Sequence, residues 1–193
     1  MNNFLFALLT NICLYAIYKY NIFFKGMKRH MRKRLELLNL IEKENINLDE
    51  ELKVPKTSGI YINIPGINPT IGINKNIGTE KEYYSILAEE LGHHFKTIGN
   101  LIKQETSYLV DILKQKEELK AKLWASNFFI SDEEFVQAIL DCSNNIYTLA
   151  EKFNVTEEII NYKILSICID EIRLNKVKET ISRHEVQYLT CNI

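Results

Sequence analysis

The sequence predicts a mostly helical α+β protein with one small β element. Three observations support this fold class. Several stretches place apolar residues at helical spacing, two capping boxes mark where helices begin, and one short stretch alternates β-branched and aromatic residues around prolines and glycines. Of the 193 residues, 46% are hydrophobic and 25% are charged, which is typical of a globular domain with its own core.

Charge and cysteine content exclude several classes of protein. The chain carries 24 basic and 25 acidic residues, so its formal net charge is −1 and no global field favours nucleic acid or another strongly charged partner. The four cysteines are scattered and include no C-x-x-C pair. A secreted disulfide scaffold and a zinc-finger array are therefore excluded, and a reducing cytoplasm is the expected compartment.

The first 26 residues differ from the rest of the chain. Residues 4–24 read FLFALLTNICLYAIYKYNIFF, which is long enough to cross a bilayer, and basic residues follow directly. One interpretation is a membrane anchor that tethers a cytoplasmic protein to the inner face of the membrane. Another is that translation begins at Met27 or Met31, and a third is a packed helix. Membrane contact is expected only through residues 4–24.

The elements after this segment are expected in a definite order. A helix covers residues 32–44, a polar connector covers 45–55, and two short strands joined by a turn lie within residues 59–75. Thr79 and Glu82 form a capping box, which predicts a helix that continues to about residue 97.

The second half of the chain is expected to be entirely helical. A capping box at Ser131 and Glu134 opens one of these helices, and Trp124 and Tyr61 are expected to be core residues. The helices are expected at residues 107–127, 131–140, 147–153, 157–165 and 166–181. We therefore divide the chain into the apolar segment 1–26, a main domain 27–140 and a helical extension 141–193.

Residues 148–164 have the spacing of a helix-turn-helix. Ala150 is the small residue where the helices would approach, and Asn154 lies at the turn, where it tolerates a left-handed backbone. Glu157 and Glu158 would place negative charges next to the phosphates of a nucleic acid, so direct binding of nucleic acid is not expected. We expect this helical pair to cap the main domain or to bind a protein.

Residues 86–97, which read ILAEELGHHFKT, carry the candidate chemistry. On a helix, residues four apart share a face, so Glu89 pairs with His93, and Glu90 pairs with His94. The zincin motif H-E-x-x-H uses this geometry, with two histidines on Zn²⁺ and a glutamate that activates water. Here a glutamate stands at the first ligand position. Since oxygen-rich sites favour harder ions, Mn²⁺ or another divalent ion is the alternative to zinc.

Three sequence blocks in this order resemble the ImmA/IrrE-type metallopeptidases of bacteria, phages and integrative elements. The blocks read GIYINIPGINPTIGIN, LAEELGHHF and EELKAKLWA, and the resemblance spans roughly residues 31–135. It implies a zincin-like fold with a short β-sheet against the active-site helix, and cleavage of a phage or mobile-element repressor. Some phage-type members also carry E-E-L-G-H-H in place of H-E-x-x-H.

The resemblance implies roles for four residues of the second block. Glu90 matches the general base, and His93 matches the second metal ligand. Glu89 takes the first ligand position as an oxygen donor, and His94 is an auxiliary candidate. The expected catalytic residue is therefore Glu90.

The third ligand of the family is an acid on the later helix. The direct match here is Lys120, which cannot bind a metal while protonated, whereas Glu117 lies one turn earlier and Glu118 is also close. Either glutamate is a candidate ligand. The competing interpretation is that both belong to a solvated, salt-bridged helix face.

Two functions remain open at this point. The first is a metal-dependent endopeptidase that cleaves a helix-turn-helix repressor, with the substrate added as a strand to residues 60–64 or 71–73. The alternative is a catalytically impaired binding module of the same fold, which relieves repression by binding its partner. Glu89 and Lys120 favour this alternative, and metal content separates the two.

Overall fold

The computed structural model describes residues 26, 28–96, 108–141, 143 and 145–183. The apolar segment 4–24 lies outside the described residues. The chain divides into two units, Met1–Glu36 and Leu37–Ile193. In the first unit, residues 28–36 are helical. No helix in the described part of the chain is long and apolar enough to span a bilayer.

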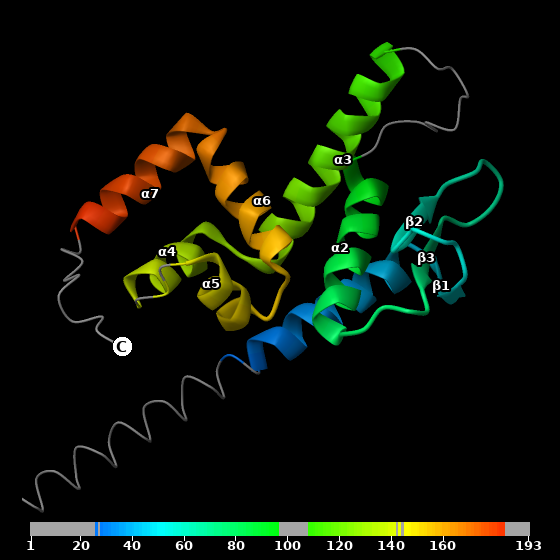
Figure 1. Cartoon of the computed structure of the whole chain (residues 1–193), viewed down its shortest axis with the longest axis horizontal. Helices are drawn as coiled ribbons and strands as arrows, with labels where there is room; N and C mark the ends of the chain where they lie inside the picture. Colours follow the sequence, from blue (N-terminus) through cyan, green and yellow to red (C-terminus); the bar gives the residue numbers. More distant parts are fainter. Residues whose placement is uncertain (1–25, 27, 97–107, 142, 144, 184–193) are drawn as a thin grey trace, which may run out of the picture. The chain divides into compact units, whose positions relative to one another are not determined.

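The second unit contains a three-stranded sheet with the order β1-β3-β2 (Figure 1). Its strands are β1 (Asn47–Leu52), β2 (Gly59–Ile62) and β3 (Thr70–Asn74). β3 pairs antiparallel with β2, which confirms the expected pair of strands, and parallel with β1. The central strand is also the most buried, because Ile71 and Ile73 are almost fully enclosed.

The expectation of a polar connector over residues 45–55 is wrong, because β1 lies there. The strand reads NLDEEL and is mostly exposed, so it lacks the alternation of apolar and polar residues by which a half-buried strand is recognised. Only Leu48 packs against the core. Charged residues are common on edge strands, where they discourage further pairing, and β1 is such an edge.

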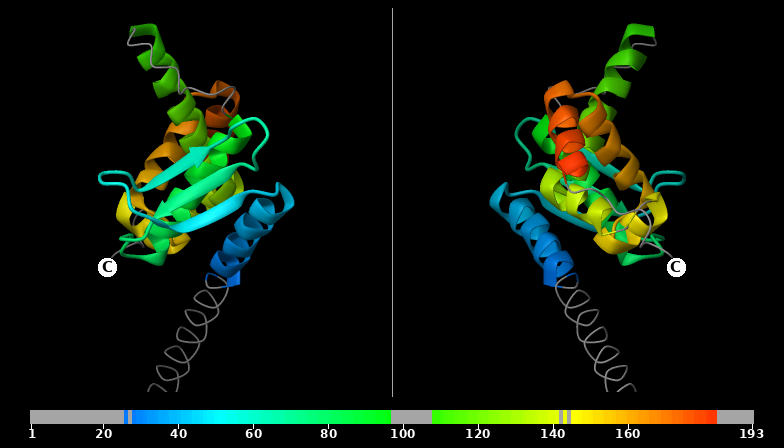
Figure 2. Two further views of the ribbon diagram at one scale, coloured as in Figure 1. Left: turned by 90° about the vertical axis from the view of Figure 1, so that its right-hand side faces the viewer. Right: turned by 90° about the vertical axis from the view of Figure 1, so that its left-hand side faces the viewer.

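The helix α2 (Glu80–Lys96) packs against the sheet over β2 and β3 (Figure 2). The Thr79 hydroxyl accepts a hydrogen bond from the backbone nitrogen of Glu82 at 3.2 Å, as the capping box predicts. α2 also packs along α3 (Tyr108–Phe129). Residues 37–43 are helical as well, and Leu37 and Ile41 join the same core. The structure therefore confirms the α+β, mostly helical fold class.

Four helices follow α3. The second capping box is confirmed, because the side chain of Ser131 and the side chain of Glu134 each accept the other residue's backbone N–H. Asn154 ends α5 with φ 50° and ψ 50°, the left-handed conformation expected at the turn. The helices are α4 (Asp132–Leu140), α5 (Ile146–Phe153), α6 (Glu157–Cys168) and α7 (Glu171–Arg183).

The expected break between residues 165 and 166 is wrong, because α6 continues to Cys168. The hydroxyl of Ser166 donates to the carbonyl of Lys163 at 2.8 Å, so this serine bonds within the helix and does not cap a new one. Asp170 provides the cap instead: its carboxylate accepts the backbone N–H of Arg173 at 3.1 Å.

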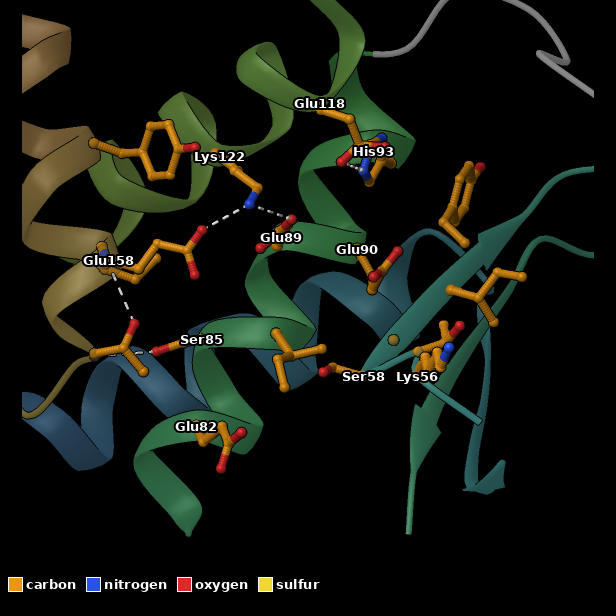
Figure 3. A pocket seen from close by; sticks show the side chains of 18 of the residues that line it. Lys56, Ser58, Glu82, Ser85, Glu89, Glu90, His93, Glu118, Lys122 and Glu158 are labelled. Atoms are coloured by element: carbon orange, nitrogen blue, oxygen red, sulfur yellow. Dashed lines mark hydrogen bonds and ion pairs between the residues drawn. The ribbon is translucent and has the colours of Figure 1, made fainter. Parts of the chain in front are cut away.

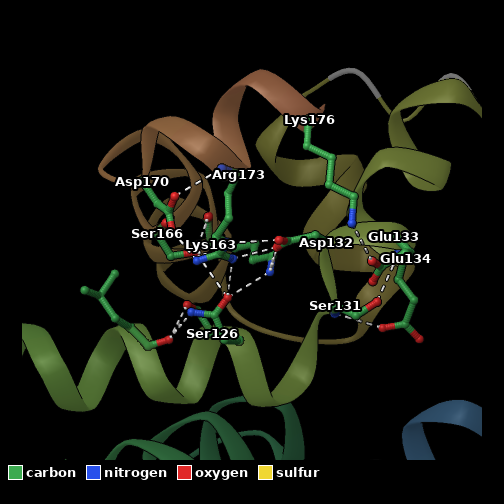
Figure 4. Close-up of polar contacts among 12 residues, drawn as sticks. Ser126, Ser131, Asp132, Glu133, Glu134, Lys163, Ser166, Asp170, Arg173 and Lys176 are labelled. Atoms are coloured by element: carbon green, nitrogen blue, oxygen red, sulfur yellow. Dashed lines mark hydrogen bonds and ion pairs between the residues drawn. The ribbon is translucent and has the colours of Figure 1, made fainter. Parts of the chain in front are cut away.

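A polar network joins α3, α4, α6 and α7 (Figure 4). The ammonium of Lys163, which is 1% exposed, lies 2.7 Å from Asp132 and 2.9 Å from Asn127. Arg173 donates to both carboxylate oxygens of Asp132, at 2.6 and 2.9 Å, and to the Ser166 carbonyl at 3.0 Å. Because Lys163 is enclosed, its charge depends on Asp132 for compensation.

Candidate metal centre

A cleft of about 1070 Å³ lies between strand β2 and the helices α2, α3 and α6. β2 and the residues before it line one wall, α2 forms the floor, and α3 and the start of α6 line the opposite wall (Figure 3). Glu89, Glu90 and His93 all line this cleft from α2, and Glu118 lines it from α3. The cleft therefore collects most of the residues that the sequence singled out.

Three of these side chains converge. Glu89 and His93 lie one turn apart on α2, and Glu118 faces them from α3. One ligand atom from each residue lies within 4.8 Å of the other two. The imidazole Nε2 of His93 and the carboxylate Oε2 of Glu118 are 3.4 Å apart.

This arrangement fits a divalent metal. In a tetrahedral zinc site with bonds of about 2.0–2.1 Å, neighbouring ligand atoms are about 3.4 Å apart. The His93–Glu118 distance already has this value, and a Glu89 carboxylate oxygen lies within 4.8 Å of both ligand atoms. Three protein ligands leave further coordination positions open toward the cleft, which is typical of a catalytic site.

Glu90 lies on the same helix but is buried, with 8% of its surface exposed. Burial raises the pKa of Glu90 to about 7, although the neighbouring charge of His93 opposes the shift. Gly59, the first residue of β2, lies directly over it: a Cβ atom there would be 2.6 Å from Glu90 Oε1. The absence of a side chain at Gly59 therefore gives this carboxylate its space.

Ion pairs organise the remaining charges of the cleft. The ammonium of Lys122 lies 3.5 Å from Glu89 and 2.6 Å from Glu158. Burial raises the pKa of Glu89, and the charge of Lys122 opposes this effect. The hydrogen bond from His93 lowers the pKa of Glu118. Burial lowers the pKa of His93, but the contact with Glu118 and the nearby carboxylates outweigh it, so the net shift is upward.

The structure separates the two candidates for the third ligand. Glu118 belongs to the cluster, whereas Glu117 turns to Lys120, whose ammonium lies 2.6 Å from Glu117 Oε1. Glu117 is 9% exposed, and its other carboxylate oxygen has no hydrogen-bond partner among the described residues. Neither Glu117 nor Lys120 is among the described residues that line the cleft.

The auxiliary candidate His94 faces away from the ligand cluster. Its Nδ1 lies 2.8 Å from the hydroxyl of Tyr61 on β2, and its Nε2 lies 3.6 Å from the carboxylate of Glu44. Tyr61 packs against the core, as expected, and it also lines the cleft. His94 thus links α2 to the sheet beside the candidate site.

Three residues of the site are not recognised from the sequence: Gly59, Lys122 and Glu158. Lys122 follows Glu118 by four residues, so the helical spacing of α3 places both on one face and is the signal that could have found it. In the sequence, Glu158 stands out only as an acid of the helix-turn-helix-like segment. Its approach to Lys122 depends on the packing of α6 against α3, which no local pattern encodes.

Comparison with known proteins identifies one family. The family model of the IrrE N-terminal-like domain, which is a peptidase domain, matches residues 41–165. This range includes the sheet, α2, α3 and most of α6. Searches of curated proteins and of solved structures give no significant match.

Proposed function

The chain belongs to the family of the IrrE N-terminal-like domain, a metallopeptidase-type family, and from this premise we propose a metal-dependent endopeptidase that cleaves a phage or mobile-element repressor. The observation that carries the proposal is the cluster of Glu89, His93 and Glu118 in one cleft, with Glu90 buried beside it. Zinc is the proposed metal. Mn²⁺ is the alternative because two of the three donors are carboxylates.

The edge of the sheet gives the substrate a place to bind. β2 is an edge strand and lines the cleft, so an extended polypeptide can add to it through backbone hydrogen bonds. The other expected strand, residues 71–73, is excluded because β3 pairs on both sides. A segment added to β2 would run beside Glu90.

The described residues supply the proton transfers that peptide hydrolysis needs. A bound divalent ion would polarise the scissile carbonyl and make a nearby water more acidic. Glu90 accepts a proton from the attacking water as the water oxygen bonds to the carbonyl carbon. The C–N bond then breaks, and Glu90 returns the proton to the departing amine nitrogen.

A protein substrate is supported by the position of the helix-turn-helix-like segment. α6 packs against α3, and Thr156, Glu158 and Ile159 line the cleft. The start of this helix therefore faces the candidate site and brings an acid to it, which is unfavourable for contact with phosphates. The identity of the substrate as a helix-turn-helix repressor rests on the resemblance of the three sequence blocks.

One observation favours the alternative, a catalytically impaired binding module. Glu89 is engaged by Lys122, so one of the two candidate ligand carboxylates already has a cationic partner. Metal content distinguishes the two functions. A protein that stays free of metal after dialysis against Zn²⁺ and against Mn²⁺ would support the binding module.

The decisive experiment compares the full chain with its Glu90→Gln variant. Each is incubated with Zn²⁺ or Mn²⁺ and with the helix-turn-helix repressor encoded nearest to its own gene, and cleavage is followed by mass spectrometry. We expect Glu90→Gln to slow cleavage by about 10²–10⁴-fold, because the general base is lost. Metal content should stay unchanged. Glu82→Gln, on the same helix at the margin of the cleft, is the matched control.

Cleavage by Glu90→Gln at the rate of the parent would contradict the role of Glu90. Absence of cleavage by the parent, together with tight binding of the repressor, would favour the binding module instead.

A further inference from the structure

Lys122 holds a central position among the charges of the candidate metal centre. Its ammonium lies 3.5 Å from the carboxylate of Glu89 and 2.6 Å from that of Glu158, and 5.3 Å from the ring centre of Tyr162 (Figure 3). Its side chain is 23% exposed. Lys122 is thus fixed from three directions, and one of its partners is a candidate metal ligand.

The charges of a bound divalent ion and its ligands indicate the role of Lys122. Two histidines and one carboxylate around a divalent ion leave a net charge of +1, whereas Glu89, His93 and Glu118 leave zero. The Lys122 ammonium adds one positive charge beside Glu89, and the Glu158 carboxylate that pairs with it lies outside the three candidate ligands. We propose that Lys122 is a positioning residue for Glu89. Its ammonium partly offsets the negative charge that a glutamate adds at the first ligand position, and it weakens metal binding as a consequence. This inference rests on the proposed metal-dependent function.

Distance makes the effect large enough to measure. A carboxylate oxygen lies about 2.0–2.2 Å from a bound zinc ion. An ion bound to Glu89 Oε1, the oxygen that lies 3.5 Å from the Lys122 ammonium, would therefore be within about 6 Å of this ammonium. At this separation, repulsion between a monovalent and a divalent cation changes affinity by about tenfold even with the dielectric constant of water. The same field stabilises negative charge that develops on a substrate oxygen.

Glu158 explains how the ammonium stays near the ion despite the repulsion. Its carboxylate makes the shorter of the two ion pairs and comes from α6, outside the two helices that carry the ligands. Helix α6 thereby contributes to the electrostatics of the centre as well as to the wall of the cleft.

The test is the Lys122→Met variant of the full chain, with two measurements other than activity. Zinc affinity is measured by competition with a chromogenic chelator, and azide affinity is measured on the cobalt-loaded protein from its visible spectrum. We expect zinc to bind about tenfold more tightly and azide about tenfold more weakly than in the parent. A merely structural role would weaken both, so the opposite signs identify the electrostatic effect.

Two controls accompany this variant. Lys114→Met removes a positive charge from the same helix and the same cleft at an exposed position, where screening should keep both affinities within about threefold of the parent. Lys122→Arg keeps the charge and should behave like the parent. If Lys122→Met does not fold, Lys122→Gln replaces it in the same measurements.

Each outcome decides the inference. An unchanged or lower zinc affinity in Lys122→Met, or an unchanged azide affinity, overturns it. A parent that binds neither zinc nor cobalt overturns both this inference and the proposed function. A parent that binds metal and cleaves in a Glu90-dependent manner, while Lys122→Met matches it in both affinities, overturns only the inference about Lys122.

Discussion

Gly92 of α2 and Ala121 of α3 lie against one another so closely that a Cβ atom on Gly92 would be 2.6 Å from the carbonyl oxygen of Ala121. The two helices therefore touch backbone to backbone at this point. His93 follows Gly92 directly, and Glu118 precedes Ala121 by one turn. The close crossing is what brings the imidazole and the carboxylate to 3.4 Å.

Replacing Gly92 by alanine should separate the helices. The added methyl group meets backbone atoms that cannot rotate away, so we expect a loss of about 1–3 kcal/mol of unfolding free energy, measured by urea denaturation. Zinc affinity should fall as well, because Glu118 moves away from His93. Gly78→Ala is the control, since a methyl group at Gly78 would meet no atom of the described residues within 4 Å. Unchanged stability and affinity in Gly92→Ala would contradict this account of the crossing.

The choice between the two neighbouring glutamates of α3 is testable by substitution. Glu118→Gln removes a charged ligand atom, and we expect zinc affinity to fall at least about tenfold. Glu117→Gln changes a side chain that pairs with Lys120 away from the cleft, so zinc affinity should stay near that of the parent. Isothermal titration of both variants is the measurement. The reverse order of effects would make Glu117 the ligand.

A histidine at position 89 should change the preference between metals. Glu89→His exchanges an oxygen donor for a nitrogen donor and restores the H-E-x-x-H pattern. The ratio of zinc affinity to Mn²⁺ affinity should rise, because imidazole suits zinc better than manganese. Competition titrations with each ion give this ratio directly. A ratio that stays constant would indicate that Glu89 is not a ligand.

The polar network around Asp132 should make stability depend on pH. The Arg173 hydrogen bonds, with a further contribution from Lys163, hold the pKa of Asp132 well below its usual range. A carboxyl group whose pKa is lower in the folded protein stabilises the fold above the pKa of the unfolded chain, about 3.9, and loses this contribution as the pH falls. Asp132→Asn should cost about 3 kcal/mol at pH 7, because Lys163 loses its enclosed counter-charge.

The difference in stability between the parent and Asp132→Asn should shrink as the pH falls below about 4. Chemical denaturation of both proteins across this range measures it. The control is Glu133→Gln, the next residue of α4, which is largely exposed and lies 3.8 Å from the equally exposed Lys176. Removing that pair should change stability by less than about 0.5 kcal/mol. A difference that does not vary with pH would show that Asp132 titrates normally in the folded protein.

Local patterns predicted most helices because their signals lie within a few residues of each other. The hydroxyl of Thr79 and the side chains of Ser131 and Glu134 cap helices where the capping boxes indicated. β1 was missed because a strand at an exposed edge is held by backbone pairing with β3 and carries little apolar pattern of its own. β1 is stabilised by pairing with β3, which lies more than twenty residues further along the chain.

Part of the candidate site can likewise be predicted from local sequence spacing, and the rest depends on how distant segments pack. Helical spacing alone places Glu89, Glu90 and His93 on neighbouring faces of one helix. The position of Glu118, and not Glu117, in the cluster depends on the rotation of α3 about its own axis where it crosses α2, and only packing fixes that rotation. Counting residues along α3 cannot supply it.

The position of Glu158 bears on how this chain can be recombined with relatives. A chimaera joined after residue 140 would take the candidate ligands and Lys122 from one parent. Glu158, which pairs with Lys122, and its side of the cleft wall would come from the other parent. Residues 122 and 158 would then come from different parents. Such hybrids should lose function unless the two positions carry opposite charges.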